Sequence, residues 1–332
     1  MLRPNNRLFV VPTLTLLTLG ALFAWQQKPP AKGTDEGSLA KFSADIRLVV
    51  CNVTVVDKTG HLVTDLPRSA FTVMENGQPQ EIRSFKREDV PVSMGLVIDN
   101  SGSMRDKRAK VAAASLALVK DSNRDDEVFV VNFNDEAFLD LPHQKDFTND
   151  ITELEDALSR IDSRGGTAMR DAIRMSIDHL KEKAHRSKKV LVVVTDGDDN
   201  SSVISLENLV KASQQSEVLI YSVGLLSEEE KRAATRAKRA LMDLTEATGG
   251  EAFFPKELTE VDRIAHQVAH DIRSQYTIQY SPANQAMDGT FRKIQVQVNA
   301  PGKPQVRTRS GYYATPDSIN TPLPKGANTL VK

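Results

Sequence analysis

The residues best suited to chemistry in this chain are carboxylates and hydroxyls that stand at the ends of apolar runs. In chain order they are Asp99, Ser101, Ser103, Thr167 and Asp196. The first three follow the apolar run 92–98 directly, and the last follows the apolar run 189–194. All five side chains offer hard oxygen donors, with no sulfur or imidazole among them. Such a set suits Mg²⁺ or Mn²⁺ and not Zn²⁺.

The charge of this donor set indicates how a partner would bind. Only Asp99 and Asp196 are charged, so two carboxylates offset the charge of a divalent ion. If water separates either carboxylate from the ion, the metal keeps its affinity for another anionic ligand. Water in the remaining coordination position would then give way to a carboxylate. The residues therefore predict a metal site that is open to a carboxylate from a partner.

These donors are positioned by an alternation of strands and helices that begins near residue 90. The predicted strands are 92–98, 127–133, 189–194, 218–223 and 251–254. The predicted helices are 107–120, 169–180, 206–215, 231–247 and 258–273. Alternation of this kind predicts an α/β fold, with a doubly wound, mostly parallel sheet and helices on both faces. Ligands of such sheets bind beyond the carboxyl ends of the strands, where the five side chains fall.

Two β-rich segments flank the α/β region. In the first, residues 71–75 and 80–85 form a predicted hairpin around Asn76-Gly77, which supplies positive φ angles. In the second, the predicted strands are 276–280, 294–298 and 306–313. Because each segment is too short to close a sandwich alone, we expect them to pair. The predicted domains are a β segment 45–89, the α/β domain 90–275 and a β segment 276–314, the two β segments forming one small sandwich-like domain.

The two ends of the chain carry different signals. Arg3 and Arg7 precede an uncharged, mostly apolar run, so residues 1–27 are predicted to be a secretory signal peptide or an uncleaved membrane anchor. Either alternative places the rest of the chain on the extracytoplasmic side, periplasmic or secreted, with membrane contact only through an uncleaved segment. Residues 28–44 are a predicted linker, and residues 315–332 are a predicted disordered tail.

Composition excludes some classes of function. The chain has 332 residues, and its 43 Lys and Arg balance 44 Asp and Glu, which gives no electrostatic basis for nucleic-acid binding. The single cysteine, Cys51, cannot form a disulfide within the chain. Because Cys51 lies within an apolar run, it is predicted to be a small core residue.

The five oxygen donors also carry a family resemblance. Asp99-x-Ser101-x-Ser103, with a distal Thr167 and a distal Asp196, resembles the complete metal-ion-dependent adhesion site of von Willebrand factor type A (VWA) domains. The resemblance covers about residues 90–275, and the flanking arrangement is similar to secreted bacterial VWA-related proteins. It implies that the hydroxyls coordinate the ion directly, that the aspartates act largely through water, and that a partner carboxylate completes the shell.

Each piece of the motif also has a purely structural interpretation. Ser103 could be a helix N-cap, and Gly165-Gly166-Thr167 could be a turn followed by a cap. Asp196 could belong to an ordinary turn that ends a strand. The joint occurrence of all pieces, in order and at the expected strand ends, favours the metal site.

Enzyme functions fit the sequence less well. A phosphatase of the haloacid dehalogenase type needs a second Asp two residues after the first, where this chain has Ser101. His266 and His270 lie one helical turn apart, but Gln267 stands where a metalloprotease needs Glu, so we expect an exposed helix face. We therefore predict a binding protein that is not an enzyme. The alternative is a scaffold of an envelope complex, in which the metal only stabilises the loops.

A second group of polar residues follows the run 189–194. Asp198, Asp199 and Asn200 offer oxygen donors close to Asp196. They would serve either as an additional cation site or as ordinary turn residues, whose side chains bond to the nearby backbone. Turn chemistry is the favoured interpretation.

Overall fold

A computed structural model describes residues 48–316, apart from residues 88, 143–144, 161–162 and 228–230. The described residues belong to one compact unit, residues 45–332. The N-terminal segment 1–27, the linker 28–44 and nearly all of the tail 315–332 lie outside the described residues. Within the described ranges, every helix is too short or too polar to cross a membrane.

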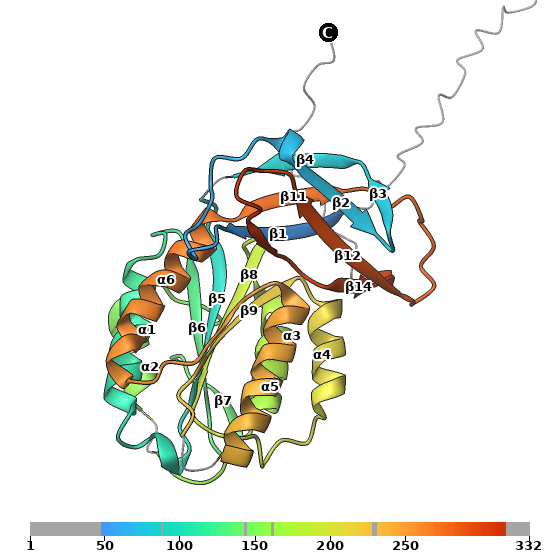
Figure 1. Cartoon of the computed structure of the whole chain (residues 1–332). Coiled ribbons are helices and arrows are strands. Elements are labelled where there is room, and N and C mark those ends of the chain that lie inside the picture. Colours follow the sequence, from blue (N-terminus) through green and yellow to red (C-terminus); the bar gives the residue numbers. More distant parts are fainter. Residues whose placement is uncertain (1–47, 88, 143–144, 161–162, 228–230, 317–332) are drawn as a thin grey trace, which may run out of the picture. The chain divides into compact units, whose positions relative to one another are not determined.

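A six-stranded sheet forms the centre of the α/β region (Figure 1). Its strands, in spatial order, are β10 (Ala252–Phe253), β9 (Val218–Gly224), β8 (Lys188–Thr195), β5 (Val92–Asp99), β6 (Glu127–Phe133) and β7 (Ala137–Leu139). All neighbours are parallel except β6 and β7. Strands β5 and β8 are buried throughout or nearly so, as expected of strands covered on both faces. The predicted doubly wound sheet is confirmed.

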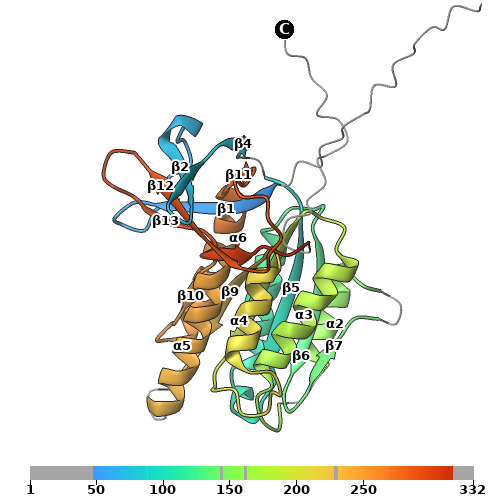
Figure 2. The same cartoon turned by 90° about the vertical axis from the view of Figure 1, so that its right-hand side faces the viewer.

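Helices cover both faces of this sheet, as Figures 1 and 2 show. Helices α1 (Arg108–Lys120), α2 (Ile151–Ser159) and α6 (Val261–Ser274) share one apolar core with the sheet. Helices α3 (Met169–Lys183), α4 (Leu206–Gln215) and α5 (Lys231–Thr248) share the core on the other face. Short 3₁₀ turns, η2 (Gly102–Met104) and η3 (Leu258–Glu260), precede α1 and α6. Strand β7 and helix α2 were not predicted, because β7 has three residues and α2 nine, too few to establish a period.

The flanking segments form two four-stranded sheets. One has the order β13 (Gln305–Arg307), β1 (Val49–Val56), β11 (Tyr276–Tyr280) and β4 (Ile82–Lys86). The other has the order β14 (Gly311–Tyr313), β12 (Phe291–Val298), β2 (Phe71–Glu75) and β3 (Gln78–Gln80), with the 3₁₀ turn η1 (Arg68–Ala70) before β2. Each sheet combines strands from both flanking segments, and one apolar core, which includes the buried Cys51, joins them.

Two predicted strands were wrong in extent, because the chain changes sheets within them. The hairpin turn is as predicted, with φ of 48° at Asn76 and 80° at Gly77, but β3 alone closes it onto β2, and β4 pairs with β11 in the other sheet. Similarly, the predicted strand 306–313 divides into β13 and β14, which lie in different sheets. An extended chain keeps its alternating pattern when it crosses between sheets, so the sequence does not reveal the crossing.

Candidate metal centre

The five predicted site residues all lie at or beside the carboxyl edge of the parallel sheet. Asp99 is the last residue of β5, and Asp196 follows the last residue of the neighbouring strand β8. Ser101 precedes η2, and Ser103 lies within it. Thr167 stands two residues before α3. The alternation of the fold therefore gathers side chains that are up to 97 positions apart in the sequence.

Asp99 is the most enclosed member of the group. Its side chain is buried, with 0% of the residue exposed. One carboxylate oxygen, Oδ1, accepts a hydrogen bond from the Ser101 amide at 2.7 Å, and Oδ2 accepts one from the Thr195 hydroxyl at 2.6 Å. Burial raises the pKa of Asp99 to about 6, although the hydrogen bonds from Thr195 and Ser101 oppose the rise. The strand end thus holds a carboxylate whose negative charge is only partly compensated.

Asp196 is connected directly to the two serines. Its Oδ1 accepts a hydrogen bond from the Ser103 hydroxyl at 2.7 Å, and the Ser103 and Ser101 hydroxyl oxygens lie 3.1 Å apart. Its Oδ2 pairs with the ammonium group of Lys107. Ser103 is not the N-cap of the following helix, because α1 begins at Arg108 and has Lys107 at its N-cap. The N-cap interpretation of Ser103 is therefore wrong.

Thr167 is held by the loop that follows β8. Its amide donates to Asn200 Oδ1 at 2.9 Å, and its carbonyl accepts from the Asn200 amide at 3.1 Å. A Cβ atom on Gly166 would lie 2.4 Å from Ser201 Oγ and 2.6 Å from Asn200 Oδ1, so a larger residue would displace these two side chains. The Thr167 hydroxyl lies 3.7 Å from the position of a Cβ on Gly197, the residue after Asp196.

Backbone hydrogen bonds hold the loop 99–103, which follows β5, against the loop 164–167, which precedes α3. The Arg164 amide donates to the Asn100 carbonyl at 3.0 Å, and the Gly102 amide donates to the Gly165 carbonyl at 3.3 Å. The Asn100 side chain in turn donates to Asn132 Oδ1 at 2.8 Å, which ties the end of β5 to β6. The structure thus links Asp99, Ser101, Ser103 and Asp196 to one another by hydrogen bonds and places Thr167 beside them.

The supporting roles of three residues at the site were not predicted from the sequence. Thr195 donates to Asp99, Asn200 positions Thr167, and Lys107 pairs with Asp196. Thr195 immediately precedes Asp196, and a hydroxyl at the end of a buried apolar strand is a signal that would have identified it. Lys107 gives no such signal, because a lysine at the start of a helix usually faces solvent.

The residues considered for a second cation site bond instead to other parts of the protein. Asp198 pairs with Arg236 at 2.6 Å, and Asp199 pairs with Arg170 at 2.9 Å. Asn200 receives the Thr167 amide, as described above. These bonds favour the structural interpretation of Asp198, Asp199 and Asn200, which hold the loop after β8 in place.

The two histidines of α6 stand on its exposed face. His266 and His270 are both exposed, and His266 pairs with Asp121. Across the described part of the chain, no three or more histidine, cysteine, aspartate or glutamate side chains are grouped to hold a metal ion. At the sheet edge, hydroxyl groups supply three of the five proposed donors, and the two aspartates supply the others.

The donors at the sheet edge fit a small divalent ion. Adjacent oxygen ligands of an octahedral Mg²⁺ site lie about 3 Å apart when each metal–oxygen distance is about 2.1 Å. The Ser101–Ser103 and Ser103–Asp196 oxygen distances of 3.1 and 2.7 Å are close to that spacing. The buried Asp99 beside them adds negative charge. Both the spacing and the hard-oxygen chemistry therefore suit Mg²⁺ or Mn²⁺.

The fold and this arrangement agree with a comparison against known families. The family profile described as the von Willebrand factor type A domain matches residues 94–267, which is just over half of the chain. The match runs from within β5 to the middle of α6 and includes all five site residues. The chain belongs to the von Willebrand factor type A domain family, and domains of this family commonly act as metal-dependent protein-interaction modules.

Individual relatives share low sequence identity with this chain. An uncharacterized protein of Borreliella burgdorferi is 24% identical over 212 residues, which are 64% of this chain and 60% of that protein. Integrin alpha-11 of Mus musculus is 30% identical over 110 residues, covering 32% of this chain and 9% of the integrin. This chain therefore spans less than two thirds of the length of either relative. A solved structure, von Willebrand factor type A from Catenulispora acidiphila, is 13% identical with a TM-score of 0.46, covering 83% of this chain and 76% of that one.

Proposed function

We propose that this protein binds a protein partner through a divalent cation held by Asp99, Ser101, Ser103, Thr167 and Asp196. The observation that carries the proposal is the hydrogen-bonded group of Ser101, Ser103 and Asp196 at the carboxyl edge of the sheet, with Asp99 buried beneath it. The ion is Mg²⁺ or Mn²⁺, because all five donors are hard oxygens. Its role is to capture a Glu or Asp of the partner.

The residues of the proposed site have different roles. The three hydroxyls would hold the ion and remain neutral, while Asp99 and Asp196 supply the negative charge. Hydrogen bonds from Thr195 and the Ser101 amide orient the Asp99 carboxylate. With two carboxylates against one divalent ion, the site keeps an affinity for a further anionic ligand, which the partner supplies.

The location and organisation of the chain complete the proposal. The charged and apolar pattern of residues 1–27 supports export, either with cleavage or as an anchored protein, so the partner would be met outside the cytoplasm. We assign the VWA domain to residues 90–275 and a small β domain to residues 45–89 and 276–314. The strand pairing between those two segments supports the second assignment.

The proposed activity is binding and not catalysis. Ser101 occupies the place at which a phosphatase of the haloacid dehalogenase type needs a general acid, and its hydroxyl oxygen lies 3.1 Å from that of Ser103. The serines of the site contact carboxylate and hydroxyl oxygens, an arrangement that suits coordination of a cation.

The test is calorimetric titration of Mg²⁺ and then Mn²⁺ into the chelator-treated full chain. We compare the wild type with Asp99→Ala and Thr167→Val; the valine keeps the shape of threonine but removes the hydroxyl. The matched control is Asp106→Ala, an exposed carboxylate in the loop between Ser103 and α1. We expect saturable binding in the wild type and control, and a loss of at least tenfold in affinity in both site variants.

The outcomes separate the alternatives. Loss of metal binding with unchanged far-UV circular dichroism in Asp99→Ala supports the site. Wild-type affinity in Asp99→Ala would sink the proposed mechanism. If the wild type itself binds neither metal at millimolar concentration, the cluster serves only the structure of the loops, and a scaffold role takes its place.

A further inference from the structure

The first turn of α1 carries an unusual charge. Its N-cap is Lys107, Arg108 and Lys110 follow, and the turn contains no acidic residue. The N-terminal end of a helix carries the positive pole of the helix dipole, so cations there are unfavourable unless other groups compensate. Each of the three cations has a partner from another element: Asp196 for Lys107, the Ser159 carbonyl for Arg108, and Asp262 for Lys110.

The partner of Lys107 differs from the other two because it belongs to the proposed metal site. The Asp196 side chain is only 1% exposed, whereas that of Lys107 is 29% exposed. A carboxylate so deeply buried is costly unless a cation or strong hydrogen bonds compensate its charge. Ser103 serves Oδ1 of this carboxylate, and the Lys107 ammonium serves Oδ2. Lys107 thus places a positive charge where a divalent ion would draw on the same carboxylate.

We propose that Lys107 is a tethered cation that competes with the divalent ion for Asp196. This inference rests on the proposed function of the site. Without metal, the ammonium group compensates the Asp196 charge and keeps the loops in place. When the metal binds, Asp196 must be shared with it or released by Lys107, whose flexible four-carbon stem and partial exposure allow the ammonium group to move toward solvent.

The charge count gives this competition a functional consequence. Asp99 and Asp196 balance a divalent ion, so Lys107 adds one positive charge to the site that these two carboxylates do not offset. A metal ion alone is therefore disfavoured, and one ligand carboxylate restores neutrality. Lys107 thereby weakens the metal site in the absence of a partner and adds to its selectivity for an acidic one.

The experiment measures Mn²⁺ affinity of the chelator-treated full chain by calorimetry. The variants are Lys107→Met, which keeps the aliphatic stem, Lys107→Gln as a second neutral replacement, and Lys107→Arg, which keeps the charge. Lys110→Met is the matched control, because Lys110 is on the same turn and pairs with Asp262. We expect both neutral variants to bind Mn²⁺ about tenfold more tightly than the wild type, and Lys107→Arg and Lys110→Met to remain within about twofold of it.

A second readout follows thermal unfolding with and without Mn²⁺. Lys107→Met is expected to lower the unfolding temperature of the metal-free protein, because Asp196 loses its partner, and to show a larger rise on adding Mn²⁺ than the wild type. Unchanged or weaker Mn²⁺ binding in both neutral variants, in a wild type that does bind, overturns this inference alone. If neither the wild type nor the neutral variants bind at millimolar Mn²⁺, the proposed function fails with it. Binding by the neutral variants alone would show that Lys107 blocks the site.

Discussion

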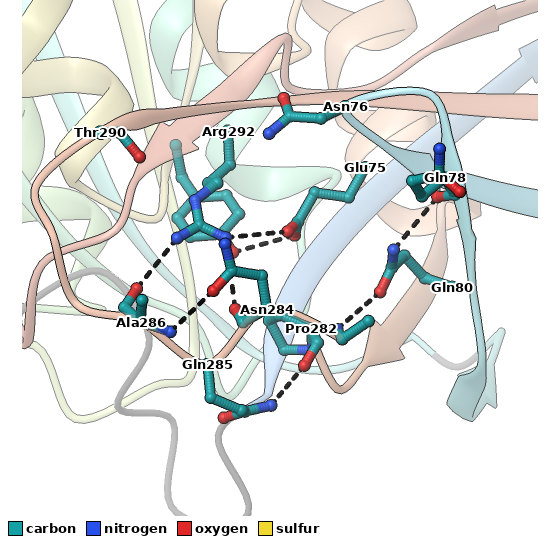
Figure 3. Close-up of polar contacts among 12 residues, drawn as sticks. Glu75, Asn76, Gln78, Gln80, Pro282, Asn284, Gln285, Ala286, Thr290 and Arg292 are labelled. Atoms are coloured by element: carbon teal, nitrogen blue, oxygen red, sulfur yellow. Dashed lines mark hydrogen bonds and ion pairs between the residues drawn. The ribbon is translucent and has the colours of Figure 1, made fainter.

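Two clusters of buried charge in this protein are built in opposite ways. At the carboxyl edge of the parallel sheet, two buried aspartates meet three hydroxyls and one partly exposed lysine. In the β region, Glu75 and Arg292 are both buried and face each other, as Figure 3 shows. The first cluster, which we call the open cluster, contains two carboxylates but only one cation. The second contains one buried charge of each sign, and Arg292 also pairs with the partly exposed Asp288 at 3.4 Å.

In the second cluster, which we call the closed cluster, groups of the protein itself provide hydrogen-bond and ion-pair partners for both buried charges. The Tyr280 and Tyr312 hydroxyls donate to Glu75 Oε2 at 2.7 and 2.9 Å. The Arg292 guanidinium donates to the carbonyls of Asn284 and Ala286 at 3.3 and 3.0 Å, and these residues belong to the loop between β11 and β12. The comparison shows that burial of charge does not by itself mark a binding site. What distinguishes the sheet edge is that two buried carboxylates lie beside a single, partly exposed lysine.

The largest effect on stability is expected when the closed cluster is broken. Replacing Arg292 by Met leaves Glu75 as a buried charge without a cation, which costs about 3–5 kcal/mol of the free energy of unfolding. Urea unfolding of the wild type and of Arg292→Met measures this difference. The control is Arg83→Met, because the Arg83–Glu81 pair is 52% and 66% exposed in its side chains.

A double variant sharpens the same test. Adding Glu75→Gln to Arg292→Met removes the orphaned charge, so part of the lost stability should return. If Arg292→Met costs no more than Arg83→Met, the β cluster is not a closed unit of buried charge, and the contrast with the sheet edge does not hold.

A third buried charge, Lys188, allows an intermediate case to be measured. Its ammonium group donates to the Ile272 carbonyl near the end of α6. Burial, assisted by the nearby Arg273 charge, lowers the pKa of Lys188 from 10.5 to about 8. Between those pH values the unfolded chain binds more protons than the folded protein, so the Lys188 contribution makes stability rise with pH.

The change expected from Lys188 is at most about 3 kcal/mol, since each pKa unit corresponds to about 1.4 kcal/mol. Its measurement is the free energy of unfolding of the wild type minus that of Lys188→Met, followed from pH 7 to pH 11. The wild type should gain on the variant above about pH 8 and should gain no further above the unfolded pKa of 10.5. A difference that is flat in pH would show that Lys188 titrates normally and that its burial carries no penalty.

The sequence predicted the open cluster better than the closed one, for a physical reason. Asp99, Ser101 and Ser103 are close in the chain, and a parallel sheet necessarily brings the end of β5 beside the end of β8. Glu75 and Arg292 are 217 positions apart, and each stands in a strand whose pattern only shows which face is buried. Their meeting depends on the pairing of β2 with β12, which no local pattern specifies.

The same distinction explains the errors in the β region. Strand positions followed from alternation, but the crossing from β3 to β4 and from β13 to β14 did not, because alternation continues through a change of sheet. At the sheet edge, the backbone contacts between the 99–103 and 164–167 loops could not be predicted from the sequence either. They depend on loop conformations such as that of Gly165, with φ of 72°.

The smallest effect is expected for an ion pair that resembles the closed cluster in chemistry but lies on the surface. Arg174 and Asp178 are one helical turn apart on α3, their atoms Nε and Oδ2 are 2.8 Å apart, and their side chains are 45% and 44% exposed. Water solvates both groups nearly as well when they are separated, so Arg174→Ala should cost less than about 0.5 kcal/mol. Urea unfolding measures this cost, and a double-mutant cycle with Asp178→Ala isolates the pair. A cost of Arg174→Ala close to that of Arg292→Met would mean that the short contact, and not burial, sets the strength of ion pairs here. The two clusters would then differ only in their number of charges.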